Sequence, residues 1–584
     1  MLERLVEYWL TSVGELGYQV PFTQLLMAEG HRVLQGPVHH PFEHGKDIIT
    51  IDPRKRLSAF QLKGPDEISD LKGLERYQGQ LDALAMAAIS HPSIGAGRLP
   101  DRVYVVTNGV LRPEVRDRLN QISAGNVARR LPPLEFIERD HLVSRLLAVH
   151  GRYLPSEPAS FRRLVELYSD DGLGPLPTQR LLSFLEESLP FTGATSPTGV
   201  QRAIGSAALL TAYALRGWEA SANHLAVAQG WLVYALVVLR LAEEQSAPPE
   251  RWEPSFALAF GAARAALERL LAEASERDDL LVPDLAEGAF YGTRVLLVCG
   301  YGSALLLAER ILGEPESSRP ALTKLLRREV KYARVLGESG GPLLFAIASA
   351  LSLLESSLVG EAVIERYARG LLLRNQPGAK GALADPYHPI DEVLARSLEL
   401  DNGEQLSDER FDGRAFTARA AIEWLTRRLR RRSVASLWAS YTLLVTCEFV
   451  PSSPARLLTL GDDDGRLEMR MPKLPGSWRD LRTEALQLDK ADVPAVLWRH
   501  PEMLPFLPLL LPPRLTASLV RVIDYLLFPS GDYVIRDSVG QEGSEPAPRQ
   551  KRPSRPASSR SVPADDGRAK ADPKPAKAPT RERK

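Results

Sequence analysis

Apolar residues near the start of the chain recur at helical spacing. They occupy positions 2, 5, 6, 9, 10 and 13, the pattern of an amphipathic helix. A second short helix is predicted over Pro21 to Glu29, because proline suits a first helical turn and Gly30 favours a helix end. The chain is therefore expected to open with two helices.

Strand patterns follow these helices. Short apolar or alternating stretches predict strands at 31–34, 47–51, 57–63 and 102–107. Turn residues between the second and third stretches indicate a hairpin, and the Asn108-Gly109 pair indicates a turn after the fourth. We also expect a helix ending near Ile89, an edge strand at 133–137 and a closing helix at 140–150. This order of elements predicts a small α/β domain over residues 1–155.

Beyond residue 155 the pattern changes to long runs rich in alanine and leucine. They predict helices at 160–190, 197–245, 252–276, 284–313, 319–357 and 408–448. No fixed repeat period is present, so a bundle or an irregular solenoid is expected in place of a named repeat fold. We expect a large all-α region divided into two helical domains, 156–376 and 377–540.

The last residues, 541–584, are rich in proline, serine, alanine, lysine and arginine and have no apolar periodicity. Such a composition cannot bury enough apolar surface to offset its ordering entropy, so this tail is predicted to be disordered. It carries 12 basic and 6 acidic residues, a net charge of +6 in a chain whose total is zero. Because the whole molecule lacks a basic surplus, any contact with nucleic acid has to be local.

Other features exclude several classes of protein. Cys299 and Cys447 are far apart in apolar surroundings, which argues against a disulfide framework or a cysteine zinc site. The apolar stretch 225–241 is shorter than a membrane span and contains Gln229 and Gly230, which favours a buried core helix. No phosphate-binding G-x-x-x-x-G-K-[ST] loop and no signal peptide are present. We expect a cytoplasmic protein without membrane contact.

The predicted hairpin carries the most informative polar residues. Asp47 opens one strand, and the sequence Gln61-Leu62-Lys63 ends the next, so Asp47 and Lys63 are expected side by side, with Gln61 and Lys63 on one face. Hydrolysis of a phosphodiester requires an anionic oxygen to hold Mg²⁺, a second oxygen ligand, and a cation that offsets the charge of the transition state. These three side chains supply that set.

The segments EHGKDIITID, AFQLKG and VYVVTNG resemble the PD-(D/E)xK superfamily, most closely its Mrr-type restriction-endonuclease branch, and occur in that branch's order. The resemblance implies a restriction-endonuclease-like fold and a DNA endonuclease that uses Mg²⁺ or Mn²⁺, and it suggests a role in restriction or phage defence. It implies that Asp47 and Gln61 are metal ligands, that the Leu62 carbonyl is a further ligand and that Lys63 is the catalytic cation. By the same analogy, cutting both DNA strands suggests a homodimer.

One expected acid departs from that pattern. The position in the first helices where the family usually has a carboxylate is Gln19 in this chain. Glu43, four residues before Asp47 and within the similar segment, is predicted to replace it as a metal ligand. We rank Glu43 above the other acids near the start of the chain, which fit an exposed helical face: Glu3, Glu7 and Glu15.

Two other functional hypotheses remain open. The first is a catalytically inactive nuclease fold that binds nucleic acid or acts as a scaffold, with the helical region holding a protein partner; Gln19 favours it. The second is an activity within the helical region, where no converging polar set is visible. The basic run 427–432 suggests either a contact with phosphates or a solvated helix end. The spacing of His31 and of the loop histidines His39, His40 and His44 does not match a closed zinc site.

Overall fold

A computed structural model gives the fold of most of the chain. It describes residues 2–36, 45–153, 158–191, 195–277, 288–378, 383–390, 392–394, 413–461, 464–529 and 533–536. Contacts divide the chain into a compact unit, 1–539, and a second unit, 540–584. The predicted disordered tail, Glu43 and the loop histidines lie outside the described residues.

A five-stranded mixed sheet forms the N-terminal part of the compact unit, in the order β1-β2-β3-β6-β7. The strands are β1 (Arg32–Gln35), β2 (Ile48–Ile51), β3 (Leu57–Lys63), β6 (Arg102–Thr107) and β7 (Leu134–Ile137). The first three run antiparallel, whereas β3, β6 and β7 run parallel to one another. All five strands were predicted from the sequence to within about two residues, including the edge position of β7.

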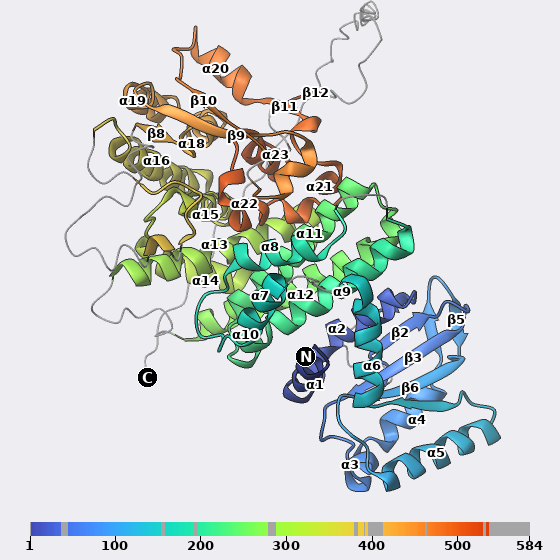
Figure 1. Cartoon of the computed structure of the whole chain (residues 1–584). Coiled ribbons are helices and arrows are strands. Elements are labelled where there is room, and N and C mark those ends of the chain that lie inside the picture. Colours follow the sequence, from blue (N-terminus) through green and yellow to red (C-terminus); the bar gives the residue numbers. More distant parts are fainter. Residues whose placement is uncertain are drawn as a thin grey trace, which may run out of the picture. The chain divides into compact units, whose positions relative to one another are not determined.

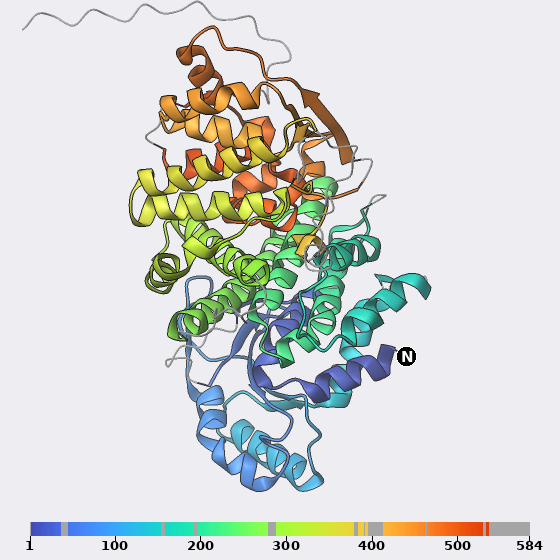
Figure 2. The ribbon, with the colours of Figure 1, turned by 90° about the vertical axis from the view of Figure 1, so that its left-hand side faces the viewer.

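Helices cover both faces of this sheet (Figure 1). One face packs on α3 (Leu71–Arg76), α4 (Gln78–Met86) and α5 (Pro113–Ala128), and the other on α1 (Leu2–Ser12), α2 (Glu15–Ala28) and α6 (Arg139–His150). In Figure 2 the sheet strands separate the light-blue helices α3 to α5 from the dark-blue α1. The sheet is thus the middle layer of an α/β arrangement. A small hairpin that the sequence did not predict, β4 (Ile89–His91) with β5 (Gly95–Arg98), follows α4.

Helix α2 corrects the sequence prediction at its start. It begins at Glu15, six residues before the predicted Pro21, which lies inside the helix. A proline in this position loses the hydrogen bond to the Gly17 carbonyl. Burial of almost every residue from Tyr18 to Ala28 offsets this loss, because α2 packs on the sheet with one face and on other helices with the opposite face.

The central part of the chain is helical, as predicted. Its helices are α7 (Pro158–Tyr168), α8 (Thr178–Ser188), α9 (Pro197–Ala214), α10 (Arg216–Ala220), α11 (His224–Gln245), α12 (Glu253–Glu276), α13 (Gly288–Leu312), α14 (Arg319–Glu329), α15 (Gly341–Leu354) and α16 (Ser357–Arg374). Helix α11 is the predicted buried core helix. Helices α11 and α13 are long and apolar enough to cross a membrane, but they are 83% and 78% buried inside the fold, as core helices also are, so they are weak evidence for a membrane span.

The expected all-α character fails in the last third of the chain. A three-stranded sheet, β10-β9-β8, and a parallel pair, β11 with β12, accompany helices α18 to α23. The strands are β8 (Arg414–Ala415), β9 (Val445–Pro451), β10 (Gly465–Arg470), β11 (Gln487–Asp489) and β12 (Val534–Arg536). The helices are α18 (Ala418–Arg427), α19 (Arg431–Tyr441), α20 (Trp478–Ala485), α21 (Ala495–Arg499), α22 (Leu507–Leu510) and α23 (Ala517–Leu527). The predicted helical run 408–448 is therefore wrong at its end, because the chain from Val445 onward forms β9, which pairs antiparallel with β10.

One hydrophobic core joins the N-terminal helices to the helical region. It contains side chains of α1, α2 and α6 together with those of the later helices. Helix α2 packs on α9 and α12, and the Gln24 side chain donates a hydrogen bond to the Ser255 carbonyl at 3.1 Å. Cys299 and Cys447 are both buried free thiols within the fold, as predicted.

Candidate active site

Asp47 and Gln61 meet at the open end of the β2–β3 hairpin. The register that pairs Ile48 with Phe60 places Asp47 across from Gln61. The Gln61 amide Nε2 donates to Asp47 Oδ2 at 2.8 Å, and the Leu62 backbone N–H donates to the same oxygen at 2.6 Å. Both side chains are buried. The structure therefore brings together two of the residues predicted to be metal ligands; the third, Glu43, lies outside the described residues.

Gln61 also carries an unsatisfied atom. Its Oε1 is buried and has no hydrogen-bond partner among the described residues. A buried acceptor without a donor costs free energy, so such an atom is suited to a cation or an ordered water. It lies beside the backbone of Gly45, where a Cβ would be 3.5 Å from Oε1.

The segment before Asp47 is fixed against α4. Gly45 has φ +72°, and a Cβ there would lie 2.6 Å from the Gln80 carbonyl oxygen, so glycine is required. Lys46 is buried, and its Nζ donates to the Ala83 carbonyl at 3.0 Å. Burial lowers the pKa of Lys46 to about 8. These contacts hold the residue next to Asp47 in one position.

Lys63 lies on the same face of β3 as Gln61, two residues further along. Its ammonium is buried and contacts Glu15 Oε2 at 3.3 Å and Glu67 Oε2 at 3.9 Å. It also lies 4.4 Å from the centre of the Tyr77 ring. The cation is thus held by two carboxylates and an aromatic face at the end of the hairpin that carries Asp47.

The carboxylate supplied by the N-terminal helices is Glu15. The expectation that Glu15 belongs to an exposed helical face is wrong, because its side chain is only 22% exposed and pairs with Lys63. Burial raises the pKa of Glu15 to about 7, against the lowering effect of Lys63, and the charges of Glu67 and Asp47 raise it further. Because Glu15 pairs with Lys63, it lies at the end of the hairpin that carries Asp47. We call Glu15, Asp47, Gln61 and Lys63 the hairpin cluster.

A signal in the sequence could have identified Glu15. It lies four residues before Gln19, one helical turn, and therefore on the same side of the helix. The late predicted start of α2 concealed this relation. Gln19 itself is buried, and Glu3 and Glu7 are exposed, as predicted.

Tyr18 fixes the backbone beneath the cluster. Its hydroxyl accepts the Lys63 N–H at 3.1 Å and lies 2.9 Å from the Lys63 carbonyl and 3.1 Å from the Val106 carbonyl, which compete for its proton. It therefore bridges the ends of β3 and β6. Because Tyr18 and Glu15 are on the same helix, this contact also helps to position Glu15 next to Lys63.

The Thr107-Asn108-Gly109 segment has a structural role. Asn108 Nδ2 donates to the carbonyls of Leu10 and Val13 at 2.7 Å each, so it caps the end of α1. A Cβ at Gly109 would lie 2.0 Å from the Pro65 carbonyl oxygen, which leaves room for glycine alone.

Other residues suggested by the sequence lie away from the cluster or have structural partners. His31 Nδ1 is 2.9 Å from Thr50 Oγ1, and burial lowers the pKa of His31. No group of three or more His, Cys, Asp and Glu side chains suited to a metal is present among the described residues.

Most of the basic run 427–432 faces the interior. Arg427 and Arg428 both bind Asp524, at 3.2 and 2.6 Å, and Arg430 lies 3.4 Å from Glu361. Neither the phosphate contact nor the solvated helix end describes these three arginines. Only Arg431 and Arg432 are exposed.

The hairpin cluster offers oxygen ligands, the type that a hard cation prefers. Its negative charge, however, is small. Asp47 and Glu15 are its two carboxylates, the Gln61 Oε1 atom is an unpartnered oxygen, and the Leu62 carbonyl is adjacent. Oxygen ligands of this kind fit Mg²⁺ or Mn²⁺, and two negative charges favour modest affinity. Neither a family model, nor a curated protein, nor a solved structure matches the chain.

Proposed function

We propose that the chain is a metal-dependent endonuclease that hydrolyses phosphodiester bonds of DNA at the hairpin cluster. The observation that carries the proposal is the convergence of Asp47, Gln61, Lys63 and Glu15 at one end of β2 and β3. The resemblance of the hairpin to PD-(D/E)xK nucleases supports the same chemistry and suggests a role in restriction or phage defence.

Each side chain has a distinct role in this proposal. Asp47, Gln61 Oε1 and Glu15 would hold Mg²⁺ or Mn²⁺, which when bound stabilises negative charge on the phosphate and makes water a better nucleophile. Lys63 places its ammonium beside the phosphate, where negative charge grows in the transition state. Tyr18 and Lys46 are positioning residues, because they act on the backbone around the cluster.

The ionisation of Glu15 makes this site sensitive to pH. Its pKa of about 7 means that the carboxyl is largely protonated in mildly acidic solution. A protonated carboxyl is a poor metal ligand, so metal binding and a proton compete for Glu15. We expect metal-dependent cleavage to increase as the pH rises through about 7.

The decisive experiment is cleavage of plasmid and phage DNA, modified and unmodified, with Mg²⁺ or Mn²⁺. Asp47→Ala and Lys63→Ala should each reduce the rate by about a hundredfold or more, with little change in DNA affinity. Glu15→Gln should be severely impaired, whereas Glu7→Gln, which removes an exposed charge from α1, serves as its control.

Two further variants decide which acid completes the site. Glu43→Gln should be severely impaired if Glu43 is the missing acid, and close to wild type if Glu15 has that role. Gln19→Ala should have a small effect, because a neutral amide adds little to Mg²⁺ binding. Cleavage unchanged in Asp47→Ala and Lys63→Ala would place the chemistry elsewhere, and an inert wild type on every substrate would reject nuclease activity.

A non-catalytic nuclease fold is the second candidate. It is favoured by Asp47 Oδ2, which already accepts two hydrogen bonds, and by the lack of a group of three metal-ligating side chains among the described residues. In that case the cluster is a structural element, and the protein binds nucleic acid or a partner without hydrolysis. Binding without any metal-dependent cleavage would support this alternative.

A further inference from the structure

The segment from Arg319 to Arg334 concentrates positive charge. It carries six basic residues and one acidic residue, Glu329, in a chain whose net charge is zero. Glu329 is buried and interacts within the fold, because it accepts a hydrogen bond from the Tyr291 hydroxyl at 2.5 Å and pairs with Arg328. The surplus of positive charge is therefore on the surface.

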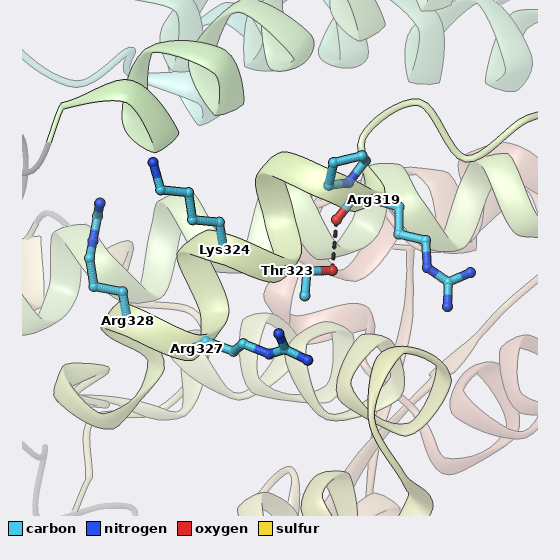
Figure 3. A pocket seen from close by; sticks show the side chains of 6 residues that line it. Arg319, Thr323, Lys324, Arg327 and Arg328 are labelled. Carbon is cyan, nitrogen blue, oxygen red and sulfur yellow. Dashed lines mark hydrogen bonds between the residues drawn. The ribbon is translucent and has the colours of Figure 1, made fainter. Parts of the chain in front are cut away.

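The cations of this segment fall into two groups. Figure 3 shows four of them on α14, where Lys324 and Arg328 point to one side. These two donate to carbonyls at the end of α12: Lys324 to Ser275 at 2.6 Å and Arg328 to Ala274 at 3.0 Å. They stabilise the negative end of that helix.

The remaining cations extend outward. Arg319 and Arg327 are 50% and 67% exposed, and each pairs with a partly exposed glutamate, Glu316 and Glu355 respectively. Lys331 and Arg334 follow α14, are exposed, and have no carboxylate partner among the described residues. An exposed ion pair is weak and is easily exchanged for a phosphate.

Exposed aromatic rings lie among these cations. Tyr332 is 49% exposed, and the Lys331 ammonium is 4.8 Å from the centre of its ring. Phe290, at the start of α13, is 46% exposed, and the Arg294 guanidinium is 5.9 Å from its ring. Two large aromatic side chains, each beside a cation, are thus exposed to solvent.

The two pairs belong to one surface. The Arg334 N–H donates to the Gly292 carbonyl at 3.1 Å, and a Cβ at Gly292 would lie 2.6 Å from the Arg334 Cβ. The Tyr291 and Tyr332 rings are 5.6 Å apart. The start of α13 and the segment after α14 are therefore packed together. We call the exposed side chains here the basic-aromatic surface: Phe290, Arg294, Lys331, Tyr332 and Arg334.

We propose that the basic-aromatic surface binds single-stranded nucleic acid. Lysine and arginine attract the phosphate backbone, and exposed rings stack on unpaired bases of any sequence. A duplex keeps its bases stacked inside, and an acidic peptide has no bases, so the rings would contribute little to either. This function is separate from hydrolysis at the hairpin cluster and does not require it.

The experiment measures binding of the full chain in EDTA, where metal-dependent cleavage does not occur. The probes are an oligothymidylate of about 20 nucleotides, an abasic strand of the same length, a duplex and polyglutamate. Phe290→Ala with Tyr332→Ala should weaken oligothymidylate binding by about tenfold and leave the abasic strand nearly unaffected. Lys331→Glu with Arg334→Glu should weaken both and reduce the salt dependence by about 0.7 for each lost phosphate contact.

Matched controls separate this surface from general effects. Tyr8→Ala removes an exposed ring that also has a cation beside it, Arg216 at 4.8 Å, and should not change the affinity. Arg431→Glu with Arg432→Glu reverses the same number of exposed charges on α19 and should have the smaller effect. All variants keep the basic tail, so its contribution is constant.

Three results would overturn the proposal. Equal affinity for oligothymidylate and the abasic strand would show that the rings do not bind bases. Competition by polyglutamate equal to that by oligothymidylate would indicate a surface for acidic proteins. Unchanged binding in both double variants would place the nucleic acid elsewhere, including on the tail. A failure of nuclease activity would affect none of these measurements.

Discussion

Two carboxylates in this molecule have a similar pKa but different surroundings. Burial raises the pKa of both Glu15 and Glu338 to about 7. Glu338, at the start of α15, accepts hydrogen bonds from four donors: the Phe416 and Thr417 N–H groups, the Thr417 hydroxyl and the Asn375 amide. In the hairpin cluster, among the described residues, Glu15 has one hydrogen-bonded partner, Lys63, and the buried Oε1 of Gln61 has none.

The difference separates a structural carboxylate from a candidate functional one. Glu338 joins the starts of α15 and α18 to the end of α16, and its hydrogen bonds offset the cost of burial. In the hairpin cluster, Gln61 Oε1 is also buried, but it accepts no hydrogen bond among the described residues. A buried polar group left without partners is often reserved for a ligand or for chemistry. The raised pKa alone would not have distinguished the two sites.

The largest expected effect is a loss of stability when Glu338, which accepts hydrogen bonds from four donors, is replaced. Glu338→Ala should reduce the free energy of unfolding by about 3 kcal/mol or more, because buried donors of Phe416 and Thr417 lose their acceptor. Denaturant unfolding measures this loss, and Glu338→Gln, which keeps one acceptor oxygen, should lose less. A loss below about 1 kcal/mol would mean that water replaces the carboxylate.

Gln61→Glu tests whether the hairpin cluster is suited to a cation, in contrast to the site around Glu338. Without metal the variant should lose about 1–3 kcal/mol, because its new carboxylate stands beside Asp47 in place of an N–H donor. Excess Mg²⁺ should restore this stability and exceed its effect on the wild type, since ligand charge increases affinity. Glu338→Gln is the control that Mg²⁺ should not stabilise. No recovery with Mg²⁺ or Mn²⁺ would indicate a purely structural cluster.

Tyr18→Phe tests whether the hairpin cluster depends on the backbone contacts that the Tyr18 hydroxyl makes. Loss of the hydroxyl leaves the buried Lys63 N–H without its acceptor and should cost about 1–2 kcal/mol. The cleavage rate should fall more than DNA affinity, because the change displaces Lys63 and Glu15 without removing a charge. Tyr8→Phe is the exposed control. An unchanged rate with the expected loss of stability would show that Tyr18 is structural alone.

A further expected effect is the pH dependence of Glu15→Gln. A carboxyl with its pKa raised from 4.5 to about 7 favours folding most below pH 4.5, and this contribution is lost as the pH rises to about 7. The Glu15→Gln variant has no carboxyl that titrates here, so its stability does not decrease in this way. Its stability relative to the wild type should therefore increase between pH 4.5 and 7 and then remain level. Thermal unfolding at several pH values measures it, and a difference independent of pH would contradict the raised pKa.

The sequence predicted contacts correctly where the two residues belong to one local pattern. The β2–β3 hairpin combines alternating residues with a short turn, so the contact between Asp47 and Gln61 followed from strand register. Glu15 was missed because its role depends on where α2 begins and on packing against Lys63, which is distant in sequence. Strand β9 was missed because the apolar run before it was predicted as one continuous helix, although Leu467 and Met469 of its partner β10 alternate with charged residues. The assignment of a restriction-endonuclease-like fold stays a prediction.

The basic residues give the same lesson on the surface. The run 427–432 is dense in sequence, yet Arg427 and Arg428 are committed to Asp524 inside the fold. The basic-aromatic surface is assembled from α13 and the segment after α14, so no single stretch of sequence reveals it. Density of charge along a chain is a poor guide to charge in space.

The packing of α2 between the sheet and the helical region has a consequence for synthesis on the ribosome. Its outer face contacts α9 and α12, where Gln24 binds the Ser255 carbonyl. Roughly 200 residues separate Lys63 from the end of α12, which at usual translation rates is about 10–40 s of elongation. Until α12 is made, α2, which carries Glu15, lacks the contacts with α12 that it has in the finished fold. A truncated transcript that ends before α12 would yield a protein in which α2 permanently lacks these contacts.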